Sequence, residues 1–174
     1  PAASAFTSLA TFDLTARGSG FDSRLCDAYR GQCIDQPITE MRLESLSDRL
    51  MYRLAYRNFG DHASLVVNHT VNADGRGRAG LRWYELRLDP SGTPSLYQAG
   101  TFAPGADHRW TGSVAMDHSG NLALGYTVSG LSTYPSIRYA GRLAGDPAGQ
   151  LTFSETDLIQ GGGAQTSINP RWGD

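Results

Sequence analysis

Arginine and tryptophan side chains are the strongest candidates for binding chemistry in this sequence. The dipeptide Arg109-Trp110 recurs as Arg171-Trp172. A guanidinium can hold a carboxylate or a sulfate through two parallel hydrogen bonds, and an indole face can stack on a sugar ring. The alternative is structural: arginines pair with acidic residues of a neighbouring sheet, and Trp fills the core with Arg at its rim. The candidate ligand-binding residues are Arg53, Arg57, Arg109, Trp110, Arg171 and Trp172.

The histidines and carboxylates do not follow a pattern typical of a catalytic or metal site. The sequence has no HExxH motif, no recognisable Ser-His-Asp order and no phosphate-binding loop. The loop from Asn72 to Gly77 offers oxygen ligands of the kind that calcium prefers, but Arg76 and Arg78 oppose a cation. We therefore expect no metal and no cofactor, and we assign no catalytic residue.

Cys26 and Cys33 are the only cysteines, and six residues separate them in a polar, glycine-containing segment. Two isolated cysteines that close a short loop are typical of a disulfide formed in an oxidising compartment. A zinc site would need two further ligands, and no His lies nearby in the sequence. We therefore predict a disulfide between Cys26 and Cys33 and a secreted or cell-surface protein.

A recurring turn indicates which elements position these residues. Asn or Asp stands three residues before Gly at 72–75, 89–92, 117–120 and 146–149. The polar side chain can accept hydrogen bonds from amides of its own turn, and Gly supplies the positive φ that closes a hairpin. Each turn lies between runs rich in strand-forming residues, which indicates antiparallel sheet built from repeated hairpins.

Alternating and strand-rich segments predict strands in two groups of four. The first group covers 49–57, 62–71, 80–88 and 95–102, and the second covers 113–116, 121–128, 136–142 and 151–157. Four-stranded meanders at a spacing of roughly 40–60 residues are typical of a β-propeller, and a β-sandwich is the main structural rival. A further strand is expected over residues 5–12.

We therefore predict an all-β protein made of propeller blades that belong to a larger ring. Residues 1–47 are expected to hold the N-terminal strand and a disulfide-pinned loop, 48–107 and 108–165 one blade each, and 166–174 the start of a further blade. A lone blade cannot bury both of its faces, and a ring needs at least about four blades. Further copies of this chain, or another chain, would complete the ring.

Composition excludes several classes of partner. The chain has 174 residues, of which 40% are hydrophobic and 18% charged, and its net charge is −2. This balance gives no electrostatic reason for binding nucleic acid or an anionic membrane. No apolar run reaches the roughly 20 residues of a membrane-spanning helix. All 15 basic residues are Arg, which reflects either genome composition or the use of Arg to recognise carboxylates and sulfates.

The segment 113–121, Ser-Val-Ala-Met-Asp-His-Ser-Gly-Asn, resembles the Asp-box of sialidase-like propellers, whose pattern is Ser-x-Asp-x-Gly-x-Thr-Trp. The match is partial: the spacing between Asp117 and Gly120 is one residue longer, and Leu122 and Ala123 stand at the Thr-Trp positions. In that family the Asp-box is a structural hairpin on the outside of the ring. The resemblance therefore implies the fold and no chemistry.

A wider resemblance covers about residues 35–174. The stretches 46–58, 65–70, 71–85, 121–126 and 134–139 are similar to large secreted bacterial proteins, which are predicted propellers mostly without assigned function. In those proteins several blades precede the cysteine loop, and the Arg-Trp-Gly-Asp motif at 171–174 continues into another strand pair. The resemblance implies the C-terminal portion of a longer propeller, and it implies no activity.

Two functions follow as expectations. The first is a binding or scaffold module that recognises a glycan or a protein ligand. The second is a sialidase-like glycoside hydrolase or lyase, which would need three arginines on a carboxylate, a Tyr nucleophile backed by Glu, and an Asp acid. These residue types are present, Tyr126, Tyr139 and Glu85 among them, but Arg and Tyr occur on most of the predicted strands. An enzyme should show arginines and paired carboxylates converging in a deep funnel.

Overall fold

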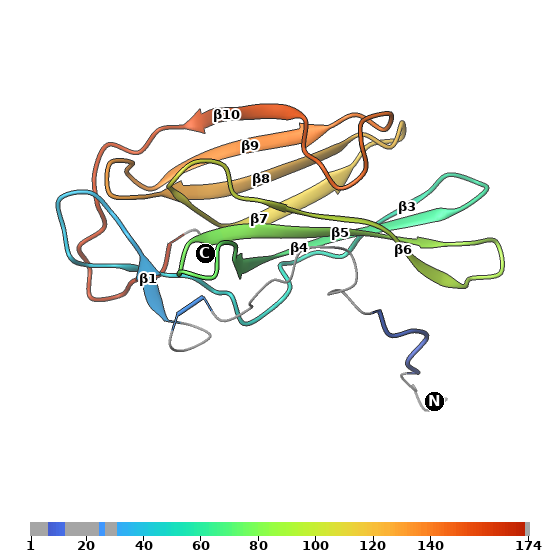
Figure 1. Cartoon of the computed structure of the whole chain (residues 1–174), viewed down its shortest axis with the longest axis horizontal. Helices are drawn as coiled ribbons and strands as arrows, with labels where there is room; N and C mark the ends of the chain where they lie inside the picture. The colour runs from blue at the N-terminus through green and yellow to red at the C-terminus, as the bar shows by residue number, and fades with distance from the viewer. Residues whose placement is uncertain (1–6, 13–24, 27–30, 173–174) are drawn as a thin grey trace, which may run out of the picture.

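Every regular element in the part of the chain that the structure describes is a β-strand. The computed structural model describes residues 7–12, 25–26 and 31–172, and the strands in these ranges form three antiparallel sheets (Figure 1). This part of the chain has no helix long and apolar enough to cross a membrane. The all-β class that the sequence predicts is confirmed.

The first large sheet, sheet I, is a meander of four strands in sequence order. Its strands are β3 (Ala55–Asn58), β4 (Ala63–Asn72), β5 (Ala79–Leu88) and β6 (Pro94–Phe102). The central strands β4 and β5 pair along their whole length of 10 residues each. Both are rich in Val, Leu, Trp and Tyr, which pack well on a pleated surface.

The second large sheet, sheet II, repeats this arrangement. Its strands are β7 (His108–Met116), β8 (Leu122–Ser129), β9 (Ser136–Arg142) and β10 (Phe153–Ile159), and each pairs with its neighbour in sequence. The predicted grouping into two four-stranded meanders is therefore confirmed. The structure holds two such sheets and no closed ring among the described residues.

The two large sheets pack face to face, and the main core lies between them (Figure 1). Because side chains alternate between the faces of a strand, Val66, Leu81 and Trp83 of sheet I point toward sheet II. There they meet an apolar set that includes Leu124 and Tyr126. Burying side chains of this size contributes roughly 1.5–3 kcal/mol each, which holds the two meanders together as one unit.

A small sheet closes one end of this unit. It consists of β1 (Gln32–Ile34) and β2 (Leu43–Glu44). The predicted disulfide is present and joins Cys26 to Cys33, with Cα atoms 5.9 Å apart. The small sheet and the disulfide pack on a second core cluster, formed by Leu25, Ile34, Leu43, Ala79 and Trp110. Ile34 of β1 and Leu43 of β2 therefore pack against residues of both large sheets, Ala79 and Trp110.

The recurring turns close largely as predicted. Their final glycines have positive φ, with values of 71°, 81°, 82° and 78° at positions 75, 92, 120 and 149. The Asp89 and Asp117 carboxylates accept hydrogen bonds from the amides two and four residues ahead. In the first turn Asn72 accepts the amide of Gly77, and Asp74 accepts two further amides. The fourth turn differs, because Asp146 accepts the amide of Leu143, which precedes it.

Two predicted strands differ from the structure: the described part of the first forms no strand, and the second is shorter. Residues 7–12 of the predicted 5–12 strand pair with no described strand, and residues 5 and 6 lie outside the described ranges. The strand predicted over 49–57 is reduced to β3. Before β3, pairing with β4 is limited to a bridge between Leu50 and His69 and a hydrogen bond from the Met51 amide to the Asn68 carbonyl. The Leu and Tyr side chains that alternate here face outward instead of packing into the core between the sheets.

Strand β7 is longer than predicted, because it begins at His108 and not at residue 113. A bulge interrupts its pairing with β8 between Trp110 and Ser113, and Thr111 has a φ of 47°. The bulge shifts the alternation of side chains by one residue. The period-two pattern therefore breaks at this point in the sequence, although the strand continues.

Candidate ligand-binding site

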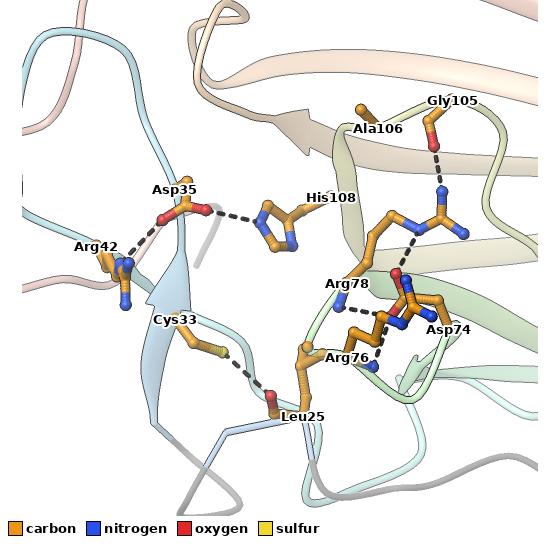
Figure 2. A pocket seen from close by; sticks show the side chains of 11 residues that line it. Leu25, Cys33, Asp35, Arg42, Asp74, Arg76, Arg78, Gly105, Ala106 and His108 are labelled. Carbon is orange, nitrogen blue, oxygen red and sulfur yellow. Dashed lines mark hydrogen bonds and ion pairs between the residues drawn. The ribbon is translucent and has the colours of Figure 1, made fainter.

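A polar hollow of about 550 Å³ lies at the end of the sheets where β4 turns into β5 (Figure 2). Its walls come from β1 and the segment after it, from the β4–β5 turn, and from the loop that leads into β7. We call it the arginine pocket. The side chains in it that can form charged or polar contacts are Asp35, Arg42, Asp74, Arg76, Arg78 and His108.

One wall is built around the carboxylate of Asp35, directly after β1. Its Oδ1 lies 2.9 Å from Arg42 Nε, and its Oδ2 lies 3.4 Å from His108 Nε2 (Figure 2). The side chain of Arg42 is 57% exposed. A guanidinium has five N–H donors in a fixed fork, so Arg42 can bind Asp35 and still offer donors to a ligand.

His108 supports this wall through both of its ring nitrogens. Its Nδ1 accepts a hydrogen bond of 3.1 Å from the Ala79 amide, so the ring proton is on Nε2, which faces Asp35. Both ring nitrogens are thus occupied, and the side chain is buried. The imidazole therefore orients the Asp35 carboxylate.

The facing wall is the β4–β5 turn. Asp74 Oδ1 accepts the amides of Arg76 at 2.8 Å and Arg78 at 3.2 Å, and Arg78 Nε lies 3.5 Å from Asp74 Oδ2. Arg78 also donates to the carbonyl of Gly105, which joins the turn to the loop before β7. Partial burial opposes ionisation of Asp74, but these amides and the Arg78 charge outweigh it and lower its pKa. Asp74 is therefore an anion at neutral pH.

Arg76 is the pocket residue whose guanidinium is free to bind a ligand. Its backbone amide is used in the turn, but its exposed guanidinium has no hydrogen-bond or ion-pair partner among the described residues. The pocket thus contains three arginines and two aspartates, a formal excess of one positive charge. Such a site attracts an anion through its free guanidinium donors, and its carboxylates can accept hydroxyl protons.

The structure places Arg109 and Trp110, two of the predicted ligand-binding residues, in the interior. Arg109 is only 3% exposed and binds Glu155 through two hydrogen bonds of 2.8 Å. Trp110 is fully buried in the second core cluster and has no exposed face for a sugar. Both residues therefore take the structural role that was the alternative prediction.

Arg53 and Arg57 are not brought together. Arg53 is exposed, with its guanidinium 5.6 Å from the ring of the adjacent Tyr52. Arg57 points toward sheet II and donates to the Met116 carbonyl at 2.8 Å. It borders an apolar hollow of about 600 Å³ on sheet II, which is distinct from the arginine pocket. The two residues therefore do not form one site.

Arg171 and Trp172 lie against the small sheet. Arg171 Nε is 3.8 Å from the Glu44 carboxylate, and Trp172 packs on the second core cluster. The Pro170 carbonyl accepts the Glu44 amide at 3.0 Å, which fixes this segment beside β2. The repeated Arg-Trp dipeptides therefore bring Trp110 and Trp172 to the same cluster and do not form a binding surface.

A tyrosine–glutamate pair of the type that a sialidase would need occurs inside sheet II. Tyr126 donates to Glu155 Oε1 at 2.8 Å, and Arg138 lies 3.1 Å from Glu155 Oε2. Tyr126 is only 3% exposed, and burial together with the Glu155 hydrogen bond and charge raises the pKa of its phenol. A buried phenol that is harder to deprotonate is a poor nucleophile, so this cluster is structural.

The sequence analysis missed the residues of the arginine pocket, although one signal pointed to them. Arg76 and Arg78 lie within and just after a glycine-containing turn, and we weighed them only as groups that oppose a cation. The same two charges favour an anion. Asp35, Arg42 and His108 gave no signal, because they join the site only when β1 packs beside the start of β7.

No protein-family model, no curated protein and no solved structure matches this chain.

Proposed function

We propose that this protein is a binding module that recognises an acidic glycan at the arginine pocket. The unpartnered guanidinium of Arg76, beside the half-free guanidinium of Arg42, is the observation that carries the proposal. A uronate carboxylate or a sulfate ester matches the planar donor fork of arginine. The Asp35 and Asp74 carboxylates would accept sugar hydroxyls next to the anion. The disulfide supports the further proposal that the protein works in an oxidising compartment, secreted or at the cell surface.

Replacing Arg76 with Gln is expected to weaken acidic-glycan binding about tenfold, because one charge-assisted hydrogen bond contributes roughly 1.5–3 kcal/mol. The protein would be screened against uronate-containing, sulfated and neutral glycans, and the best ligand measured by calorimetry. Arg49→Gln is the matched control, because Arg49 pairs with Asp48 and does not line the pocket. Equal binding of neutral and acidic glycans, or unchanged affinity in Arg76→Gln, would contradict the proposal.

We also propose that sheets I and II are propeller blades that pack against further sheets of the same kind. The outer face of sheet I carries exposed apolar side chains, among them Leu50 at 58% and Tyr56 at 60%. Tyr56 lies two residues before the end of the first strand of its sheet, and Val114 has the same place in sheet II. Val114 is buried between the sheets. The face of sheet II that carries Val114 is thus covered by sheet I, whereas the equivalent face of sheet I, which carries Tyr56, is open.

The outer side of sheet II is shaped to receive the exposed apolar side chains of sheet I. Ala115 and Ala123 leave it low, and the apolar hollow of about 600 Å³ lies there, with Tyr139 and Phe153 in its lining. The unit thus has an apolar hollow on the outer side of sheet II and exposed apolar side chains on the outer face of sheet I. Two different but complementary surfaces favour head-to-tail association, which closes a ring or extends a filament. Further copies of this chain, or a further chain, would supply the missing sheets.

The native mass in solution tests this association. Sedimentation velocity on purified protein is expected to show species larger than the 18.7 kDa chain. Replacing Tyr56 with Asp is expected to dissociate them, because it places a charge in the apolar contact. Tyr97→Asp is the control, because Tyr97 is a 45% exposed residue of the same sheet that does not belong to the proposed apolar contact. A stable monomer at all concentrations would show that the two sheets form a self-contained sandwich.

A further inference from the structure

A second, smaller hollow lies between the large sheets at the end opposite to the arginine pocket. Strand β7 starts at the arginine pocket with His108 and ends at this hollow with Met116. We call it the junction hollow, because Glu85 of sheet I and Arg142 of sheet II both line it. Its volume of about 140 Å³ corresponds to roughly four or five water molecules.

Arg142 is a buried cation whose hydrogen-bond donors are not all used. The residue is 3% exposed, its Nη2 donates to the Asp146 carbonyl at 2.5 Å, and its buried Nε has no partner. Its side chain forms no ion pair in the part of the chain that the structure describes. Burying a guanidinium is costly unless an anion compensates the charge. The Asp146 carboxylate attracts Arg142 electrostatically but accepts no hydrogen bond from it. The buried Nε donor of Arg142 therefore stays without an acceptor.

The carboxylates nearby do not accept a hydrogen bond from Arg142. Glu85 Oε1 accepts from Ser64 Oγ at 2.9 Å and Arg87 Nε at 2.7 Å, while Oε2 accepts from Gln98 Nε2 at 2.6 Å. The side chain of Asp146 is directed to two other donors, an amide and a hydroxyl. Glu85 is thus paired with Arg87, and Arg142 Nε remains a buried donor without an acceptor.

His62 adds an unpartnered acceptor to the same hollow. Its Nδ1 lies 2.8 Å from Asp61 Oδ1, so this nitrogen carries the proton and donates to the carboxylate. Its Nε2 then keeps a lone pair, and this atom is buried without a hydrogen-bond partner. The hollow thus offers donors at Arg142 and an acceptor at His62.

We propose that the junction hollow binds a small hydroxycarboxylate such as glycolate. The carboxylate would accept hydrogen bonds from Arg142, and the hydroxyl would donate to His62 Nε2. Such a ligand satisfies both unpartnered groups and fits the volume. Because it would contact residues of both sheets, its binding stabilises the native arrangement of the unit.

A side-chain NMR titration tests this proposal. The Nε–H resonance of Arg142, identified by its loss in Arg142→Gln, is expected to shift saturably with sodium glycolate at constant ionic strength. Acetate is expected to bind about tenfold more weakly, because it lacks the hydroxyl, and sodium chloride is expected to give no saturable shift. Arg53→Gln is the matched control, because Arg53 does not line the hollow.

Two further readouts make the result decisive. His62→Phe is expected to reduce glycolate affinity to that of acetate, and an unchanged preference would overturn the role of His62. In the wild-type protein, a nuclear Overhauser contact is expected between the glycolate methylene and the Met116 methyl, which needs no variant. Absence of that contact at saturation, an equal response to chloride, or unaltered binding in Arg142→Gln would overturn the site. The arginine pocket lies at the other end of the sheets, so its own test stands or fails separately.

Discussion

Replacing Glu155 with Ala is expected to lower the free energy of unfolding by about 3 kcal/mol, because it leaves a buried arginine without its partner. Glu155 binds Arg109 through both carboxylate oxygens and also accepts from Tyr126 and Arg138. The side chain of Arg109 is 4% exposed, so water cannot replace the lost partner well. Burial opposes ionisation of Glu155, but the hydrogen bonds and the arginine charges outweigh it and lower its pKa.

Urea unfolding at neutral pH measures this effect. Asp157→Asn is the matched control, because Asp157 also pairs with Arg138 but its side chain is 36% exposed, and a much smaller loss than in Glu155→Ala is expected. The double variant Arg109→Leu and Glu155→Leu is expected to recover most of the loss, since apolar side chains can replace a buried ion pair. A loss below about 1 kcal/mol in Glu155→Ala would mean that the cluster is hydrated and adds little to stability.

The meanders could be predicted from the sequence because the residues that specify each hairpin lie within that hairpin. Alternation, strand-forming residues and glycines with positive φ recur in each hairpin, and these features fix strand order without knowledge of distant contacts. Strand ends were less predictable, as the bulge after Trp110 shows. The pairing of β1 with β2 was missed because these strands are only 3 and 2 residues long, too short for a period-two signal.

The candidate sites depend on contacts between segments far apart in the sequence. His108 meets Asp35 across 73 positions, and Arg109 meets Glu155 across 46. The residue type of Arg109 was compatible with ligand binding or with an internal ion pair, and only its packing decides between them. Arg76 was recognisable as a charge in a turn, but its open guanidinium becomes meaningful only beside Asp35 and Arg42.

Stability is expected to fall by up to about 3 kcal/mol as the pH drops from about 6.5 to about 4, and His69 is expected to cause this loss. Burial, with a smaller contribution from the charge of Arg82, lowers the pKa of His69 from 6.5 to about 4. Its Nε2 lies 2.9 Å from the Tyr84 hydroxyl, on the outer face of sheet I. The unfolded chain binds the proton near pH 6.5 and the folded chain only near pH 4, so acidification between these values favours unfolding.

His69→Gln is expected to flatten this part of the pH profile, because Gln can keep a hydrogen bond to the Tyr84 hydroxyl but does not titrate. Unfolding free energies would be measured at intervals from pH 7.5 to about 4 for the wild type, for this variant and for His118→Gln, a change at an exposed turn residue that should leave the slope intact. The turn carboxylates Asp89 and Asp117, whose pKa values are lowered, lose their contribution only below the ordinary value of 3.8. Their titration therefore lies outside the window. If the slope between pH 6.5 and 4 persisted in His69→Gln, another group would have to carry the proton uptake, and the burial of His69 would not control the acid stability of sheet I.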